Sequence, residues 1–302
     1  MTQKEYWRWD EKCWKDESMD SSDVKIISVG IDIGSVSSEA AICLDGKFYA
    51  SNTVRTGSNS PTSAKDALKP LLEHAEISYE AVDFIVGTGY GRVNIPFQDK
   101  AVTEIACHGR GANYMVGPSL RTILDMGGQD CKAIHIDERG KVTNFLMNDK
   151  CAAGTGRGME TIADLLKVPI TEIGDRSFQI NAPAEPISNV CVVFAKSEAM
   201  AMVKSGKTLN EVLASYCKAM ADRVTQLLDR IGMEKEFFIT GGISKNRGVT
   251  ERIEENLGIE AVKPKDERFD AQTAGALGAA LFGFVLASKK GSKKDTRKGQ
   301  IL

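Results

Sequence analysis

A short pattern occurs twice in this 302-residue chain, and it limits the possible folds more than any other feature. Each copy is an apolar segment, an aspartate, a glycine turn and a second apolar segment, which is typical of two strands joined by a tight turn. The copies are Ile-Asp-Ile-Gly-Ser at residues 31–35 and Leu-Asp-Met-Gly-Gly-Gln-Asp at residues 124–130. A third glycine turn, Thr-Gly-Gly-Ile, follows at residues 240–243. The repeat predicts two related α/β lobes with their junction near residues 115–120.

Periodicity and composition divide the chain into four segments. Two lobes, residues 25–117 and 118–287, carry the strand and helix patterns, and the final helix at 272–287 can pack on either lobe. Segment 1–24 is an extension with three Trp and one Tyr, and segment 288–302 is a basic tail. Both ends lack periodicity, so we expect solvated extensions. The aromatic extension is equally consistent with docking on a partner or on its own core.

Composition argues against several classes of protein. Lys and Arg number 39 against 41 Asp and Glu, whereas a nucleic-acid-binding chain is usually basic. The apolar stretch at residues 274–287 is too short to span a bilayer and predicts a buried helix. The polar N-terminus lacks the apolar region of a signal peptide, so we expect a cytoplasmic protein without membrane or nucleic-acid partners. Seven cysteines, an odd number, favour thiols, metal ligands or core residues over a disulfide framework.

The glycine turns point to phosphate binding. Glycine lets the backbone approach closely, so that N–H groups can donate to anionic oxygens. The aspartates at the strand ends, Asp32 and Asp125, supply carboxylates for hydrated Mg²⁺, which needs few protein ligands. Ordinary β-turns are the alternative explanation, but two such hairpins and a third glycine turn favour a nucleotide site.

This arrangement resembles the actin, Hsp70 and sugar-kinase ATPase superfamily. The resemblance implies an α/β fold with two lobes, a duplicated mixed sheet flanked by helices, and ATP bound with Mg²⁺. Asp32 and Asp125 would hold the cation and orient the attacking water, with Gln129 as a third catalytic candidate. The expected nucleotide contacts are the first phosphate loop (Gly34 and Ser35), the second phosphate loop (Gly127, Gly128 and Gln129) and the adenosine turn (Gly241 and Gly242). Asn246 is expected either to contact the nucleotide or to cap the following helix.

Two other glycine-rich stretches resemble nucleotide-binding motifs but do not match them. Residues 201–208 nearly match the P-loop, but Ala201 replaces the first glycine and the stretch follows a predicted helix. We interpret Gly206 as a helix stop, with Thr208 and Glu211 as a capping box. The Gly-Thr-Gly-Tyr-Gly-Arg segment at residues 87–92 is not a dinucleotide fingerprint, and we expect it to have a structural role.

Two cysteines differ from the rest in their surroundings. Cys151 lies among small residues before one predicted helix, and Cys191 lies directly before another. A thiolate is favoured at a helix N-terminus. Two cysteines cannot complete a four-thiolate site, but a dimer offering two from each chain could hold a [4Fe–4S] cluster. Spacing alone leaves open the alternative of small core residues, which we expect for Cys43, Cys107, Cys131 and Cys217.

The combination of motifs resembles the activator family of 2-hydroxyacyl-CoA dehydratases and benzoyl-CoA reductases. The motifs are Asn-Asp-Lys-Cys-Ala-Ala-Gly-Thr-Gly-Arg at 148–157, the later Cys191, and the glycine turns described above, and the resemblance covers residues 26–288. It implies an ATPase that shares one [4Fe–4S] cluster between two subunits, with Cys151 and Cys191 as ligands. It further implies a ferredoxin-like donor and an electron delivered to a partner enzyme.

Within that family the chain most resembles the smaller ATPase subunit of an ATP-dependent benzoyl-CoA reductase. That assignment implies a second, different ATPase subunit and catalytic reductase subunits that reduce an aromatic ring. The first alternative is a homodimeric activator of a 2-hydroxyacyl-CoA dehydratase. A sugar or N-acetylhexosamine kinase of the same fold, and a nucleotide-dependent scaffold without redox activity, are more distant alternatives.

The first phosphate loop departs from the family pattern. Family members commonly continue after Gly-Ser with a Thr and, three residues later, a Lys. This chain has Val36 and Glu39 at those positions. The change weakens any side-chain contact with phosphate there, while the backbone contacts of Gly34 and Ser35 stay available.

Overall fold

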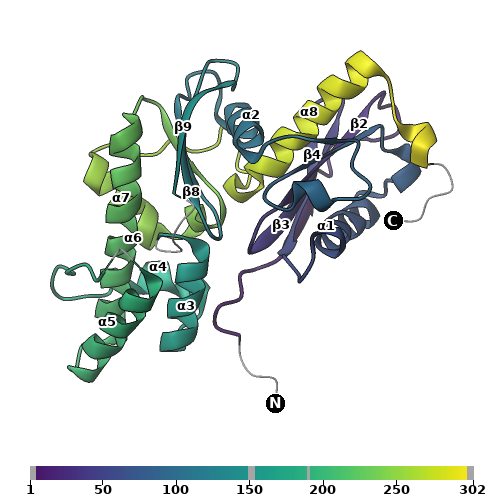
Figure 1. Cartoon of the computed structure of the whole chain (residues 1–302). Helices are drawn as coiled ribbons and strands as arrows, with labels where there is room; N and C mark the ends of the chain where they lie inside the picture. The colour runs from purple at the N-terminus through teal and green to yellow at the C-terminus, as the bar shows by residue number, and fades with distance from the viewer. Residues whose placement is uncertain (1–4, 149–153, 189–190, 298–302) are drawn as a thin grey trace. The chain divides into compact units, whose positions relative to one another are not determined.

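The computed structural model describes residues 5–148, 154–188 and 191–297, and the chain divides into two compact units (Figure 1). Unit 1 consists of Met1–Trp9, Arg121–His135 and Asn144–Lys263. Unit 2 consists of Asp10–Leu120, Ile136–Thr143 and Pro264–Leu302. Each unit is therefore assembled from three stretches of chain, whereas the sequence pattern suggested contiguous lobes.

Unit 2 contains a mixed sheet of six strands. Its first four strands in sheet order are antiparallel neighbours, and the last two run parallel to β2. The sheet order is β1 (Lys12–Lys15), β4 (Lys47–Arg55), β3 (Ser37–Leu44), β2 (Ile27–Ile33), β5 (Phe84–Thr88) and β6 (Lys100–Ala101). Every residue of β2 is buried, as expected for a central strand covered on both faces.

Helices cover both faces of this sheet. Helix α1 (Ser60–Ala75) is capped by Asn59, whose side chain accepts a hydrogen bond from Thr62 N. It packs its buried apolar residues into a core with the odd-numbered residues of β2. Helix α8 (Ala274–Lys290) lies along the sheet in Figure 1 and meets the even-numbered residues of β2. A Cβ on Gly30 would lie 1.9 Å from Ala276 O, so glycine is required for this close approach.

The apolar composition of α8 is explained by its packing. The helix contacts β2, β3, β5 and helix α2 (Glu104–Val116). By length and composition alone Ala271–Lys289 could cross a membrane, but 61% of its most apolar window is buried inside the protein. The structure therefore accounts for this segment as the core helix of unit 2, as the sequence predicted.

Most of a second mixed sheet belongs to unit 1. Its order is β10 (Phe237–Thr240), β7 (Thr122–Met126), β8 (Cys131–Ile136) and β9 (Val142–Asn148). Strand β10 is parallel to β7, and β7 is antiparallel to β8. The helices of this unit are α3 (Gly156–Leu166), α4 (Ile173–Arg176), α5 (Val192–Lys204), α6 (Leu209–Ile231) and α7 (Arg247–Leu257).

Residues 201–208, which nearly match a P-loop, have the predicted helix-turn-helix structure. Helix α5 ends at Lys204, and Gly206 follows with a φ of +92°. The side chain of Thr208 accepts a hydrogen bond from Glu211 N, and the Glu211 carboxylate accepts one from Thr208 N at 2.8 Å. This capping box starts α6, so the stretch is the end of one helix and the start of the next.

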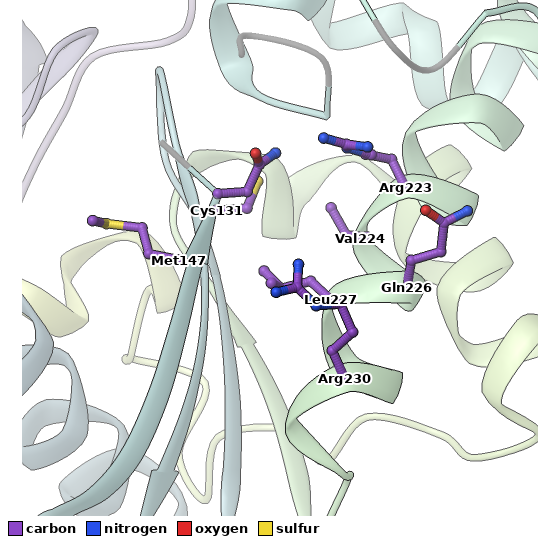
Figure 2. A pocket seen from close by; sticks show the side chains of 8 residues that line it. Cys131, Met147, Arg223, Val224, Gln226, Leu227 and Arg230 are labelled. Atoms are coloured by element: carbon purple, nitrogen blue, oxygen red, sulfur yellow. The ribbon is translucent and has the colours of Figure 1, made fainter. Parts of the chain in front are cut away.

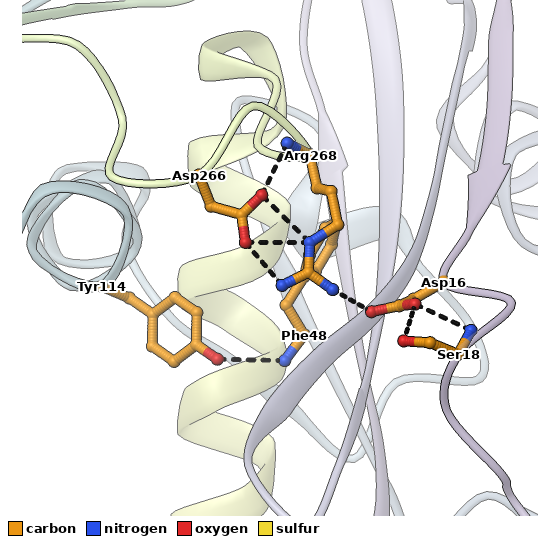
Figure 3. A network of polar contacts seen from close by, with 6 residues as sticks. All are labelled: Asp16, Ser18, Phe48, Tyr114, Asp266 and Arg268. Atoms are coloured by element: carbon orange, nitrogen blue, oxygen red, sulfur yellow. Dashed lines mark hydrogen bonds and ion pairs between the residues drawn. The ribbon is translucent and has the colours of Figure 1, made fainter.

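The N-terminal segment is more ordered than a solvated extension. Strand β1 pairs antiparallel with β4, and the Trp14 ring stacks on Phe48 with centroids 5.4 Å apart. Figure 3 shows how the chain continues: Asp16 accepts hydrogen bonds from Ser18 N and Oγ and forms an ion pair with Arg268. The segment extends the sheet of unit 2 because a free edge strand offers unpaired N–H and C=O groups. This strand and its ion pair are called the N-terminal strap below.

Two further expectations need correction. The sequence pattern predicts a helix over residues 100–115. Residues 100–101 instead form the edge strand β6, and the helix begins only at Glu104, because the parallel pairing with β5 competes with helix formation. In the basic tail, Arg297 is buried and forms an ion pair with Asp99. The described part of the tail is therefore packed on unit 2 through a paired charge.

Candidate functional site

The first predicted phosphate loop is a four-residue hairpin turn in unit 2. Ile33 and Ser38 are paired across β2 and β3, and residues 34–37 connect them. Gly34 N donates to Ser37 O at 3.0 Å, and the Thr56 hydroxyl donates to Gly34 O at 2.8 Å. These bonds close the turn beside Asp32.

The second predicted phosphate loop has the same construction in unit 1. Met126 and Cys131 are paired across β7 and β8, and residues 127–130 connect them. Gly127 N donates to Asp130 O at 3.0 Å, the same closing bond as in the first loop. The start of α3 is joined to this turn, because Gly156 N donates to Gly127 O and Arg157 N to Gly128 O.

A second pair of glycine turns lies beside the two aspartates. Asp32 is in register with Thr88 on the parallel strand β5, and Asp125 is in register with Thr240 on β10. A glycine follows each threonine, with φ of +82° at Gly89 and +83° at Gly241. A Cβ on Gly89 would lie 2.3 Å from Asp32 Oδ1, and one on Gly241 would lie 2.4 Å from Met126 O. Only glycine fits both turns.

This second correspondence is not foreseen by the sequence interpretation. For the Gly-Thr-Gly-Tyr segment the sequence favours a structural role over sensing of the nucleotide. Its Thr88-Gly89 pair is nevertheless the counterpart of Thr240-Gly241, where the predicted adenosine turn begins. The sequence feature that could have revealed this correspondence is a Thr-Gly pair directly after an apolar strand in each half of the chain. Tyr90, next in this turn, is 84% exposed.

The two aspartates have different partners. In unit 1, Asp125 accepts a hydrogen bond from the Thr240 hydroxyl at 3.0 Å and pairs with Lys132 Nζ at 3.3 Å. In unit 2, the ion-pair partner of Asp32 among the described residues is His108, with Nε2 3.6 Å from Oδ2. His108 is buried, and it lies beside the predicted catalytic carboxylate. Asp32 is thus less constrained by side chains than Asp125.

Backbone and amide groups complete the surroundings of Asp32. A Cβ on Gly275 would lie 1.9 Å from Asp32 Oδ2, so the first turn of α8 closely approaches the carboxylate. The positive end of the helix dipole favours a negative charge there. Across the hairpin, Asp32 is in register with Glu39, which accepts a hydrogen bond from Gln272 Nε2 at 2.9 Å. Two buried carboxylates therefore lie at the end of this hairpin.

The other predicted nucleotide contacts are divided between the units. Unit 2 brings Asp32, Gly34 and Ser35 together, and Ser35 is half-buried. Unit 1 brings together the second loop and the adenosine turn, with Gln129 exposed at the tip of its hairpin. Gly242 starts a 3₁₀ turn, Gly242–Lys245. Asn246 is buried and caps α7 by accepting a hydrogen bond from Val249 N at 3.3 Å, the structural alternative foreseen for it.

Of the two predicted cluster ligands, the structure describes Cys191. Cys191 is half-buried at the start of α5, while Cys151 lies outside the described residues. The Glu198 carboxylate accepts a hydrogen bond from Ser188 N at 2.6 Å, which ties Ser188 to this helix. Val193 and Phe194, on the first turn of α5, are 68% and 62% exposed.

The four cysteines that were expected to be core residues are buried. Burial raises the pKa of Cys43 and Cys131 well above the ordinary thiol value. It raises the pKa of Cys107 to about 12 and that of Cys217 to about 11. Such thiols stay protonated and do not serve readily as metal ligands. Cys191 is thus set apart from these four by its position and exposure. Within the described ranges, no group of three or more His, Cys, Asp or Glu side chains could hold a metal ion.

A small cavity lies beside the second hairpin in unit 1. Figure 2 shows Arg223, Gln226 and Arg230 of α6 next to Cys131 and Met147. The Cys131 thiol donates to Gly154 O at 2.9 Å. The cavity measures about 100 Å³. Small-molecule sites usually exceed about 300 Å³, so this cavity is too small for a whole nucleotide.

Comparison with known proteins places these features in context. The BadF/BadG/BcrA/BcrD ATPase family matches residues 29–283. The activator of lactoyl-CoA dehydratase from Anaerotignum propionicum is 40% identical over 87% of this chain and 99% of its own length. A benzoyl-CoA reductase subunit from Thauera aromatica is 32% identical over 85% of this chain and 93% of its own length.

A solved structure is similar over nearly the whole chain. It is the activator of the 2-hydroxyisocaproyl-CoA dehydratase from Clostridium difficile with bound ADPNP, with a TM-score of 0.81 and 34% identity. The similarity covers 92% of this chain and 99% of that one.

Proposed function

The chain belongs to the BadF/BadG/BcrA/BcrD ATPase family and has the actin-like α/β ATPase fold, and from this premise we propose that it is the ATP-hydrolysing activator of a 2-hydroxyacyl-CoA dehydratase. The observation that supports nucleotide binding is the pair of matching hairpins, each closed by a glycine N–H bond beside a buried aspartate. A dehydratase activator is 40% identical to the chain and the benzoyl-CoA reductase protein 32%, which favours the homodimeric activator over the reductase component expected first.

The proposed nucleotide contacts follow from the two hairpins. Backbone N–H groups of Ser35 and Gly128 would donate to phosphate oxygens, because those of Gly34 and Gly127 already close the two turns. Residues 241–242 would line the nucleoside. Asp32 would hold hydrated Mg²⁺, because it is the aspartate with the fewer side-chain partners. Asp125 and Gln129 would position the attacking water. In this reaction the water oxygen bonds to the γ-phosphorus, the bridging oxygen leaves with ADP, and a proton is released.

Cys191 fits the proposed [4Fe–4S] cluster, and Cys151 is its predicted companion. Cys191 combines incomplete burial with a position at the N-terminus of a 13-residue helix, so its sulfur is not enclosed in the core as those of the four buried cysteines are. Two thiolates from each of two chains would complete the ligand set. When bound, the cluster supplies one-electron chemistry at low potential. The proposed partners are a second copy of the chain, a ferredoxin-like donor and the dehydratase subunits.

Iron analysis of anaerobically purified full-length chain tests this proposal. We expect about four irons per two chains, matched by acid-labile sulfide and an EPR signal on reduction. Cys191→Ser and Cys151→Ser should lose the iron, whereas Cys13→Ser, which changes an exposed thiol in β1, should keep it. The exposed side chains Val193 and Phe194 flank the expected interface, so dimerisation is measured in parallel.

The rival functions give different results. Iron that appears only on co-expression with a different ATPase subunit would favour the benzoyl-CoA reductase assignment. No iron under anaerobic conditions, together with ATP turnover that depends on a sugar, would indicate a kinase of the same fold. Binding of ATP without hydrolysis or iron would indicate a nucleotide-dependent scaffold.

A further inference from the structure

A buried lysine connects the second hairpin to its aspartate. The Lys132 side chain is 3% exposed, and its Nζ lies 2.7 Å from Asp130 Oδ1 and 3.3 Å from Asp125 Oδ2. Asp130 is the last residue of the four-residue turn, and Asp125 lies at the end of β7. One ammonium group therefore joins the turn to the carboxylate.

Other bonds fix Asp125 and the turn as well. The Thr240 hydroxyl donates to the other oxygen of Asp125, Oδ1, at 3.0 Å. Asp130 O accepts the closing bond from Gly127 N. Each oxygen of Asp125 thus has its own donor, and the carboxylate has a fixed direction. A buried charge is stabilised only when it is paired in this way.

The corresponding position in unit 2 has the opposite charge. Lys132 is in register with Asp125, and Glu39 is in register with Asp32 in the matching hairpin. Glu39 is engaged by the Gln272 amide. The lysine is therefore not needed to form this kind of hairpin, since the other copy forms without it.

We propose that Lys132 is a positioning residue for ATP hydrolysis: it holds the Asp125 carboxylate and the 127–130 turn in one fixed arrangement. This inference rests on the proposed function. The ammonium neutralises Asp125, so the phosphate-binding N–H groups of the turn face less negative charge. Lys132 does not contact the reacting atoms; its buried charge acts through Asp125 and Asp130.

The test compares Lys132→Met and Lys132→Arg with the wild-type chain in steady-state ATP hydrolysis. A displaced catalytic group typically reduces turnover about a hundredfold, so we expect that loss in kcat for Lys132→Met with KM for ATP changed less than about threefold. Lys132→Arg keeps the charge and should recover part of kcat. Lys218→Met, a lysine on α6 with a surface ion pair to Asp222, is the matched control and should behave as wild type.

A second variant and a binding measurement keep the test decisive if Lys132→Met fails to fold. Asp130→Asn removes the negative charge that lies 2.7 Å from Lys132 Nζ and leaves the Asp125 pair, and it should lower kcat less than Lys132→Met but in the same direction. Unchanged kcat in a folded Lys132→Met or in Asp130→Asn would overturn the inference. A fall in kcat matched by the same fold-loss in nucleotide affinity, together with a lower melting temperature, would also overturn it. That result would indicate a purely structural role. If wild-type chain neither binds nor hydrolyses ATP, the proposed function fails instead.

Discussion

The two copies of the hairpin repeat share a backbone and differ in charge. Each has a four-residue turn, a closing glycine N–H bond and an aspartate in register with a threonine on a parallel neighbour. In unit 1 the cross-strand partner of Asp125 is Lys132, and in unit 2 the partner of Asp32 is Glu39. The comparison teaches that turn residues set the backbone, while the cross-strand partner decides what each carboxylate can do.

The charges are balanced differently in the two copies. Unit 1 uses an ion pair, in which the lysine holds its aspartate directly. Unit 2 has no lysine at the matching position and surrounds its carboxylates with the first turn of α8, the Gln272 amide and His108. Dipoles and amides stabilise a charge without neutralising it. Asp32 therefore stays available to a cation, while Asp125 is already paired.

The largest expected effect comes from removing the charge of each aspartate. Asp125→Asn leaves the buried ammonium of Lys132 with one carboxylate, and we expect a loss of about 3 kcal/mol in the free energy of unfolding. Asp32→Asn removes only the longer, 3.6 Å contact with His108, so we expect a stability change below about 1 kcal/mol but a roughly hundredfold fall in ATP hydrolysis. Urea unfolding and a steady-state ATPase assay measure the two quantities. Equal stability losses would show that the two carboxylates are equivalent.

The glycines of the paired turns test the shared backbone. Gly89→Ala and Gly241→Ala each place a Cβ in a positive-φ turn and against the neighbouring strand, so we expect losses of at least about 2 kcal/mol in unfolding free energy. Gly206→Ala is the matched control, because its φ is +92° but nothing lies within 4 Å of the added Cβ. The Gly206→Ala variant should lose only about 1 kcal/mol in unfolding free energy. Thermal unfolding of the three variants gives the comparison, and similar losses in all three would refute the close-approach argument.

Exchanging the charge at position 39 makes the two copies more alike. Glu39→Lys places a cation opposite Asp32, as Lys132 lies opposite Asp125. We expect the Mg²⁺ concentration for half-maximal ATPase activity to rise about tenfold, because an ammonium near the carboxylate repels the cation. Glu39→Gln, which removes charge without reversing it, should show a smaller rise. An unchanged Mg²⁺ titration in both variants would mean that Asp32 does not hold the cation.

The smallest expected effect concerns a sheet edge. In unit 2 the N-terminal strap covers the edge strand β4, whereas β9 in unit 1 is a largely exposed edge. The Ser18 hydroxyl and the Arg268 charge hold the pKa of Asp16 below its ordinary value. The stabilisation is thus complete above the unfolded pKa and is lost as the pH falls through the lower folded value, below about pH 4.

Asp16→Asn is expected to remove this pH dependence. The variant should be less stable than wild type by about 1 kcal/mol at neutral pH and should lose less additional stability on acidification. Urea unfolding at neutral pH and near pH 3 measures the difference. Parallel losses in both proteins would show that Asp16 is not the group responsible.

A structural feature could be predicted from the sequence where it depends on residues close together along the chain. The strand and turn pattern around Asp32 and Asp125 is local, so both hairpins with their glycine turns were predictable, whereas their role in phosphate binding stays a prediction. The capping box at residues 208–211 is local too, and it correctly separated a helix junction from a P-loop. The cluster assignment of Cys151 and Cys191 came from the family resemblance and stays a prediction.

The sequence by itself determined the repeat, because the repeat follows from short-range patterns of apolar residues, glycines and turn residues. The fold class and the family came from the resemblance of its motifs to known families. The tertiary structure alone decided which groups face each aspartate. His108 and Gly275 reach Asp32 from helices far along the chain, and Thr240 reaches Asp125 across 115 residues. Such contacts depend on helix packing and on parallel strand pairing, which join distant segments and leave no local pattern.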